Sequence, residues 1–217
     1  MKRIPYQIIY EDEKVIVVNK NYSVFTIATD DKKTYHRNLH YYLNRYLEEK
    51  KERVFLVHRL DYETSGLLVF AKDIETQKKL KDCFLNHTIG RYYEAVIEEK
   101  RNPDKDFRLY ETYLSINQQN GKVSLSDKEH GKYTAREYKR RNPIQIGTSR
   151  LIKLITGRKN QIRIGIHDLG YTLIGDNRYS HSISKRMYLN CFSLVFPENI
   201  CLKQNSFSIN PLWIKSS

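Results

Sequence analysis

Runs of apolar residues separated by polar turns divide the first third of the chain into expected strands. Ile8–Tyr10 and Val15–Asn19 flank the polar segment Glu11–Lys14, which predicts two strands joined by a turn. Gly66–Ala71 is a continuous apolar run, a pattern typical of a strand buried on both faces. The chain is therefore expected to open as a hairpin and to continue into a buried strand.

Apolar residues at helical spacing predict two amphipathic helices in the same part of the chain. The first covers roughly Tyr35–Lys51 and ends in the solvated charge run Glu48–Arg53. Asp73 is placed to cap the second, over Ile74–Leu85. One side of this second helix is traced by Ile74, Gln77, Leu80 and Phe84.

The rest of the chain is expected to be rich in strands. Asn120-Gly121 predicts a two-residue hairpin turn, and the polar residues 98–110 predict a surface excursion. A short helix is expected over Gln161–Leu169, with Gly170 to end it and Arg163 on a different face from its apolar side chains. The expected strands are Arg91–Ile97, Glu111–Ile116, Lys132–Lys139, Ser149–Ile155 and Met187–Phe196.

No Pro/Gly/Ser-rich stretch divides the 217 residues, so a single domain over residues 1–217 is expected. The succession of elements predicts an α+β fold, with a mixed and largely antiparallel sheet flanked by helices. The N-terminus lacks the apolar core of a secretory signal, and no run reaches the length of a membrane span. We therefore expect a soluble, cytoplasmic protein without a membrane partner.

Charge and aromatic content point to a polyanionic partner. Thirty-eight Lys and Arg against 25 Asp and Glu give a net charge of +13, which favours nucleic acid at long range. Seventeen tyrosines add side chains that stack on unpaired bases, which tilts the expectation toward RNA. A merely basic protein with tyrosines in its core and strands explains the composition about as well. Composition alone leaves both interpretations open.

The cysteines and histidines do not predict a metal site. Cys83, Cys191 and Cys201 have no short spacing typical of zinc ligands and are expected to be free thiols. His36 and His40 lie four apart on an expected helix, but no third ligand is near them in the sequence. A solvated or partly packed pair is the expectation.

The stretch His58–Lys72 is the strongest candidate for chemistry. A cation, a carboxylate and two hydroxyls stand directly before the apolar run: Arg59, Asp61, Thr64 and Ser65. A plain loop whose polar side chains bond their own backbone is the alternative. The stretch resembles the HRLD-x-x-TSGLL-x-FAK signature of the RluA-type pseudouridine synthases, which isomerise uridine in RNA.

Further motifs carry the resemblance from about Glu11 to Pro211. They are Asp12–Lys20, similar to D-x-x-x-x-V-x-NKP with Asn21 in place of the proline; Arg91–Val96, similar to K/R-x-Y-x-A-V; Leu154–Arg163, similar to L-x-TGR-x-HQIR; and Gly175–Tyr179, matching GD-x-x-Y. The resemblance implies the pseudouridine synthase catalytic fold with a central basic cleft. It also implies a single catalytic domain, without an S4-like RNA-binding domain, and a reaction that needs neither cofactor nor metal.

By this resemblance, Asp61 is the catalytic carboxylate, Tyr93 the active-site aromatic and Arg163 a buried cation paired with Asp61. Burial raises the pKa of an Asp by roughly 3 units or more, and a nearby arginine lowers it by about 1 to 3, so Arg163 would keep Asp61 ionised. The alternative for Arg163 is a helix-surface cation. The alternative for Tyr93 is an ordinary core tyrosine of a strand.

The resemblance gives the other residues lesser roles. Arg59 is expected to fill the gap left by a flipped uridine, with a salt-bridge partner as the alternative, and Arg158 to meet a phosphate or to be a solvated cation. His58, Thr64, Ser65 and Gly66 are expected to support the loop. The departures from the family pattern are Tyr62, Arg136, where threonine is frequent, Asn160, in place of histidine, and Asn190, in place of histidine.

The expected activity is the isomerisation of specific uridines in a tRNA or rRNA stem-loop. Two other classes of protein remain open: a catalytically silent RNA-binding or chaperone protein on the same fold, and a glycosyl hydrolase that uses Asp61 with a second carboxylate such as Glu63. Whether Asp61 attacks the sugar or the base, or stabilises a cationic sugar, is also left open.

Overall fold

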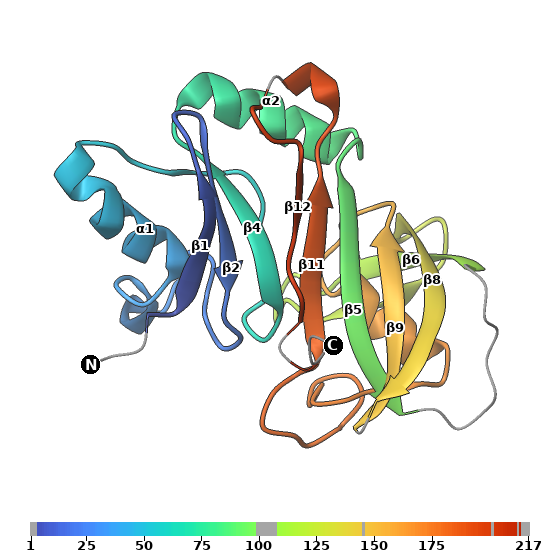
Figure 1. Ribbon diagram of the computed structural model, residues 1–217. Coiled ribbons are helices and arrows are strands. Elements are labelled where there is room, and N and C mark those ends of the chain that lie inside the picture. The colour runs from blue at the N-terminus through green and yellow to red at the C-terminus, as the bar shows by residue number, and fades with distance from the viewer. Residues whose placement is uncertain (1–3, 99–107, 145, 201, 212, 214–217) are drawn as a thin grey trace. The chain divides into compact units, whose positions relative to one another are not determined.

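The computed structural model describes residues 4–98, 108–144, 146–200, 202–211 and 213 (Figure 1). These residues form two compact units. One is made by the chain up to Ile89 together with the chain from Asn190 onward, and the other is the continuous segment Gly90–Leu189. Below they are called the discontinuous unit and the continuous unit. The predicted single domain over residues 1–217 stays a prediction.

The discontinuous unit is built on a sheet whose central strands run in the order β1-β2-β4-β11. β1 and β2 form the predicted N-terminal hairpin, and β4 pairs with β2 antiparallel and with β11 parallel. Two short strands extend the sheet, β3 on β4 and β12 on β11. The strands are β1 (Tyr6–Glu11), β2 (Val15–Lys20), β3 (Phe55–Leu56), β4 (Ser65–Ala71), β11 (Leu189–Val195) and β12 (Ser206–Ser208).

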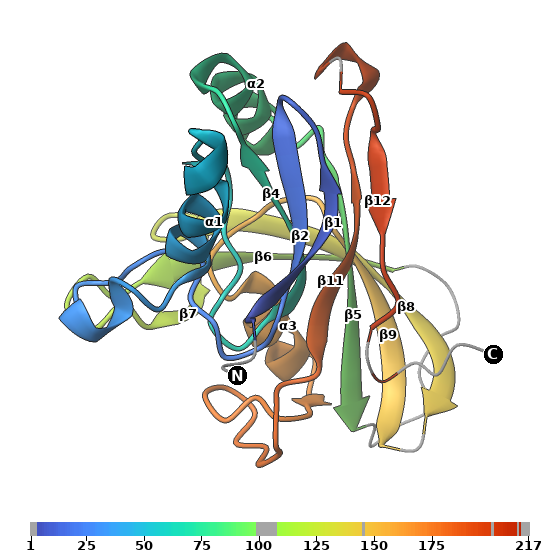
Figure 2. The same cartoon turned by 60° about the vertical axis from the view of Figure 1, so that its left-hand side comes forward.

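Side-chain caps fix where the helices of this unit begin. The helix predicted over Tyr35–Lys51 is shorter, because Asn38 accepts a hydrogen bond from the Tyr41 N–H at 2.9 Å and caps α1 (Leu39–Leu47) there. α1 lies beside the β1–β2 hairpin in both views (Figures 1 and 2). Asp73 caps α2 (Ile74–Leu85) as predicted. The short 3₁₀ helices are η1 (Lys32–Thr34), η2 (Glu48–Lys50) and η3 (Glu198–Ile200).

The continuous unit is an antiparallel sheet in the order β5-β9-β8-β6-β7, with β10 paired to β5. One helix, α3 (Gln161–Asp168), ends as predicted at Gly170, which has a positive φ of 79°. The strands are β5 (Gly90–Glu98), β6 (Arg108–Ile116), β7 (Val123–Ser126), β8 (Lys132–Ile144), β9 (Gly147–Leu154) and β10 (Thr172–Leu173).

One predicted turn is wrong. Asn120-Gly121 is not a two-residue hairpin turn, because Ile116 pairs with Val123 and the loop between β6 and β7 has six residues. The Asn117 side chain accepts hydrogen bonds from the N–H groups of residues 119 and 120, which stabilises this longer loop. On the side of α2 that Ile74, Gln77, Leu80 and Phe84 trace, Leu80 is fully buried and Ile74 is 51% exposed. Most of the polar segment 98–110 lies outside the described residues.

The predicted α+β class, with a mixed and largely antiparallel sheet, is confirmed. β4 is buried along its whole length, in agreement with its unbroken apolar run. It begins next to Gly66, whose φ of 116° and close approach to the backbone of Cys191 leave no room for a Cβ atom. No helix among the described residues is both long and apolar enough to cross a bilayer.

Candidate active site

The loop that carries Asp61 is fixed on both sides by backbone hydrogen bonds. The hydroxyl group of Thr26 donates to the Leu60 carbonyl at 2.9 Å and accepts from the Leu60 N–H at 3.2 Å. On the other side, the Thr64 N–H donates to the Asp61 carbonyl at 3.2 Å and closes a turn. Asp61 itself is half-buried. The backbone of the candidate carboxylate is therefore held in place just before β4.

A buried lysine supports the same loop and was missed by sequence reasoning. Lys20 ends β2 with no exposed surface, and its ammonium group donates to the carbonyls of Asn21, Val24 and Tyr62 at 3.0, 2.8 and 3.3 Å. A buried charge is tolerable when it is hydrogen-bonded in this way. Lys20 thereby ties the residue after Asp61 to the chain that follows β2. The sequence signal that could have indicated a buried lysine is the dipeptide Asn19-Lys20, which directly follows an apolar run.

The residues predicted to support the loop bond the elements around it. The Nε2 atom of His58 accepts from the Val69 N–H on β4 at 3.2 Å, and its ring stacks on Phe84 with 4.3 Å between centroids. Thr64 and Ser65 are buried, and Ser65 Oγ accepts from Nδ2 of Asn190 on β11 at 2.8 Å. Asn190, one of the departures from the family pattern, is thus a partner of the loop.

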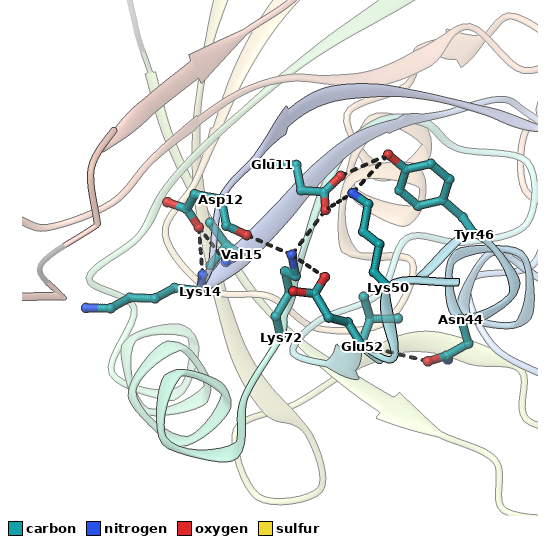
Figure 3. Close-up of polar contacts among 10 residues, drawn as sticks. Glu11, Asp12, Lys14, Val15, Asn44, Tyr46, Lys50, Glu52 and Lys72 are labelled. Carbon is teal, nitrogen blue, oxygen red and sulfur yellow. Dashed lines mark hydrogen bonds and ion pairs between the residues drawn. The ribbon is translucent and has the colours of Figure 1, made fainter. Parts of the chain in front are cut away.

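The lysine at the end of the same motif has a structural role, shown in Figure 3. Lys72 Nζ donates to a carboxylate oxygen of Glu11 at 3.1 Å and to the Asp12 carbonyl at 2.9 Å, and it pairs with Glu52 at 2.6 Å. Burial lowers the pKa of Lys72, but the hydrogen bonds to Glu52 and Glu11 outweigh burial and the pKa is raised. Its contribution to stability is therefore present below the ordinary lysine pKa and is lost as pH rises through the raised value.

Tyr93 lies in the middle of β5 and is 7% exposed. It pairs in register with Ile152 on β9, so the two side chains share one face of the sheet. The next residue, Glu94, points to the other face and accepts a hydrogen bond from Ser149. Burial of Tyr93 agrees with a core tyrosine and with an aromatic beneath a substrate, so its catalytic role stays a prediction.

Arg163 is a buried cation on α3, and the alternative that it is a helix-surface cation is wrong. Its side chain is 4% exposed and its guanidinium forms a two-pronged ion pair with Asp176, through Nε at 2.9 Å and Nη2 at 2.7 Å. Such a fork-to-carboxylate pair fixes the plane as well as the position of the guanidinium. The predicted burial of Arg163 is confirmed, and Asp176 is a partner that the sequence did not indicate.

A second pair of side chains completes this cluster. Asn160, at the start of α3, accepts from Arg163 Nη1 at 3.4 Å and donates from Nδ2 to the Tyr179 hydroxyl at 2.9 Å. The Tyr179 ring lies 5.2 Å from the Arg163 guanidinium. Asn160 is a departure from the family pattern that contacts Arg163 directly.

The two predicted RNA-contacting arginines are both exposed. Arg158 precedes α3 in a turn held by Gln161, whose side-chain oxygen accepts from the Arg158 N–H at 3.0 Å. The Arg158 side chain itself makes a long contact with the Tyr133 carbonyl at 3.5 Å. Exposure of Arg59 and Arg158 is what a contact to RNA requires, and their roles stay predictions.

Asp61 belongs to the discontinuous unit, and Tyr93 and Arg163 belong to the continuous unit. His58, Thr64 and Ser65 lie in the same unit as Asp61, and of these three Thr64 is bonded to the Asp61 backbone. The predicted pairing of Asp61 with Arg163 joins residues of different units and stays a prediction. Among the described residues, no three His, Cys, Asp or Glu side chains are grouped as a metal ion would need.

Comparison with known proteins gives a consistent result. A family model described as RNA pseudouridylate synthase matches residues 14–167. An uncharacterized RNA pseudouridine synthase of Mycoplasma capricolum is 31% identical over 90% of this chain and 67% of its own length. Ribosomal large subunit pseudouridine synthase D of Borreliella burgdorferi is 33% identical over 81% of this chain and 55% of its own length.

Solved structures show the same fold. Human RNA pseudouridylate synthase domain containing 4 superposes with a TM-score of 0.72 at 18% identity, covering 94% of this chain and 88% of that one. Human RNA pseudouridylate synthase domain containing 1 gives 0.71 at 20% identity, covering 94% and 82%. The chain thus matches those structures nearly from end to end, but spans only about half to two thirds of the length of the curated relatives.

Proposed function

Because the chain belongs to the RNA pseudouridylate synthase family, we propose that it isomerises uridine to pseudouridine in RNA, with Asp61 as the catalytic carboxylate. The observation that carries this proposal is the built loop around Asp61: buried Lys20 and Thr26 hold its backbone from one side, and His58 and Ser65 bond the strands beside it. Because a buried ammonium group must keep its hydrogen bonds, the contact of Lys20 with the Tyr62 carbonyl holds this loop in one conformation.

The chemistry needs a carboxylate that stays ionised while the base is handled. The bond from ribose to the ring nitrogen of uracil breaks, the base turns, and a bond forms from the ribose to carbon 5. Carbon 5 then loses a proton and the freed ring nitrogen takes one up, so that the product is an isomer of uridine. Asp61 acts at the sugar or the base in the first step. We assign Tyr93 to stacking on the uracil and to relaying the proton from carbon 5, and Arg163 to keeping Asp61 ionised.

We further propose ribosomal RNA of the large subunit as the substrate class, because relatives carry that description. A target uridine must leave its stack before it reaches Asp61, at a cost of a few kcal/mol that is least in a loop. Exposed Arg59, two residues before Asp61, is positioned in sequence to occupy the vacated space, and exposed Arg158 to meet a phosphate. The net charge of +13 favours encounter with any RNA.

Asp61→Asn tests the assignment, with Glu63→Gln as the matched control two residues away. We expect Asp61→Asn to lower turnover more than about a thousandfold, because the group that does the chemistry is gone, while RNA affinity changes by no more than a few fold. Glu63→Gln should keep near-normal turnover. The measurement is the release of hydrogen from carbon 5 of labelled uridine in large-subunit rRNA fragments.

The same assay separates the rival functions. Release of free uracil, with loss of activity in Glu63→Gln as well, would indicate a glycosyl hydrolase with two carboxylates. RNA that binds to the wild-type protein and remains unchanged in every fragment would indicate a silent RNA-binding protein. Substantial pseudouridine formation by Asp61→Asn would overturn the assignment of Asp61.

A further inference from the structure

An exposed aromatic residue stands directly after the candidate catalytic carboxylate. Tyr62 is 39% exposed, although Leu60 and Thr64 of the same loop are buried. Its ring packs on that of Phe25, with 4.4 Å between the centroids and 38° between the planes. Phe25 thus supports the Tyr62 ring from one side, and the exposed part of the ring remains open to a partner. Both residues, like Asp61, belong to the discontinuous unit.

Hydrogen bonds hold the backbone beneath this aromatic pair. The Tyr62 carbonyl accepts from the Val24 N–H at 3.2 Å and from Lys20 Nζ at 3.3 Å. The Phe25 carbonyl accepts from the N–H of Leu39, the first residue of α1, at 2.8 Å. Both rings therefore stand on backbone that is fixed within one unit. A surface that is organised in advance loses little conformational entropy when a partner packs on it.

A nucleobase fits the chemistry of this surface. A tyrosine ring offers a flat face on which any unpaired base can stack, with little dependence on sequence. A uridine that leaves its stack to reach Asp61 takes a stacking partner away from its neighbours in the RNA chain. Those neighbours therefore gain most from an aromatic face beside Asp61. Exposed Arg59, three residues before Tyr62, adds a positive charge to the same exposed loop.

We propose that the Tyr62 ring, supported by Phe25, is a subsite for the unpaired base next to the target uridine in the RNA chain. The inference rests on the proposed function, because it takes Asp61 as the carboxylate at which that uridine is placed. The neighbouring nucleotide is covalently joined to the target, just as Tyr62 is joined to Asp61. Stacking on Tyr62 replaces the contact that the neighbour lost, so it stabilises the flipped state. Tyr62 thereby contributes to the choice of uridine, by favouring a target whose neighbour is also unpaired.

A tyrosine that merely covers Phe25 would have different consequences. Tyr62→Leu keeps an apolar side chain against Phe25 but has no aromatic face, whereas Tyr62→Phe keeps the face and loses only the hydroxyl group. If residue 62 serves as a cover, both variants bind RNA as wild type does. If it stacks on a base, only Tyr62→Phe does. Because residue 62 is exposed, each variant should keep the wild-type melting temperature, which is checked first.

The experiment measures binding of the full chain to loop fragments of large-subunit rRNA, each with a fluorescent purine analogue beside a uridine. We expect Tyr62→Ala and Tyr62→Leu to bind roughly 5- to 100-fold more weakly than wild type, and Tyr62→Phe to bind within about twofold. Wild type and Tyr62→Phe should quench the analogue by stacking on it. The matched control is Tyr46→Ala, which removes a tyrosine of the same unit that is also 39% exposed and should not change binding.

Salt dependence supplies a second measurement. Stacking neutralises no phosphate, so the slope of log affinity against log salt should be the same in Tyr62→Ala and wild type, whereas the loss of one phosphate contact lowers it by about 0.7 for single strands. Wild-type affinity in folded Tyr62→Leu, a lowered salt slope, or an equal loss in Tyr46→Ala would overturn the inference. Failure of the proposed function looks different, because the wild-type protein then releases no hydrogen from carbon 5, whatever residue 62 contributes to binding.

Discussion

Two arginines of the continuous unit are buried almost equally and are held in opposite ways. Arg163 on α3 has a carboxylate against its guanidinium, whereas Arg136 on β8 has none: its Nη1 and Nη2 atoms have no hydrogen-bond partner in the described part of the chain. Arg136 instead lies over the ring of Tyr110, 4.1 Å from its centroid. Burial lowers the pKa of Arg136 to about 10, so it remains charged at neutral pH.

The backbone around Arg136 has adapted to its side chain. The guanidinium occupies the space where a Cβ atom of residue 165 would stand, and residue 165 is a glycine in the middle of α3. Arg163, on the same helix, needs no such gap because it extends to Asp176. Arg163 is thus held by a directional ion pair. Arg136 is held by the face of the Tyr110 ring and by the space that the absence of a side chain at Gly165 leaves. Only the first arrangement fixes where a cation points.

Of the changes at these two arginines, Arg163→Met should lower stability and activity the most. The change leaves the Asp176 carboxylate buried without its cation, and we expect a loss of about 3 to 5 kcal/mol in the free energy of unfolding, together with loss of activity. Urea unfolding measures the first and single-turnover assays the second.

The double variant Arg163→Met with Asp176→Asn tests whether the loss of stability comes from the buried Asp176 charge. The Asp176→Asn change keeps a side-chain acceptor for the backbone N–H groups of Arg178 and Tyr179 and removes the buried charge, so most of the stability should return while activity does not. Return of activity in the double variant would show that Arg163 has no part in the reaction.

Gly165→Ala should have an intermediate effect. The added methyl group would overlap the Arg136 guanidinium, and overpacking of this kind costs typically 1 to 3 kcal/mol. Combining it with Arg136→Thr, which shortens the opposing side chain, should recover part of that loss in urea unfolding. If the two changes simply add, the contact between the side chain of Arg136 and the helix is not what constrains residue 165.

Arg136→Met should have the smallest net effect. The depressed pKa of Arg136 corresponds to a burial cost of about 3 kcal/mol at neutral pH, which Met removes, while the lost contact with the Tyr110 ring costs up to about 2 kcal/mol. We expect a protein about 1 kcal/mol more stable, with unchanged turnover. A loss of 3 kcal/mol or more would mean that an anion or water compensates the Arg136 charge.

Local features were predictable where neighbouring residues determine the structure. The unbroken apolar run predicted the buried strand β4, and Asp73 predicted the start of α2, since both depend on residues a few positions apart. The Asn120-Gly121 prediction failed because the side chain of Asn117 stabilises a longer loop than the dipeptide alone favours. The predicted start of α1 at Tyr35 was too early, because the side chain of Asn38 caps the helix.

The candidate site shows the same limit at longer range. The motifs indicated Asp61 and Arg163. They did not indicate Asp176 as the partner of Arg163, because it lies thirteen residues further along the chain and only the folded structure brings the two side chains together. The ammonium group of Lys20 reaches Tyr62 across 42 positions, so no local pattern reports its burial. The reason for a glycine at position 165, inside a helix, is likewise a side chain on another element.

The split of the discontinuous unit between the two ends of the chain has a consequence for synthesis. Ser65 and Asn190 are bonded although 125 residues separate them, so β4 acquires its parallel neighbour β11 only after the entire continuous unit has been translated. The continuous unit is an uninterrupted segment, so its own pairings need no residue that is translated after it. Until then the part of the β4 edge that pairs with β11, at Ser65 and Gly66, lacks its partner, and contacts of such long separation form slowly. In a nascent chain stalled before residue 190, we therefore expect the continuous unit to be folded and the discontinuous unit to be incompletely folded and prone to aggregation.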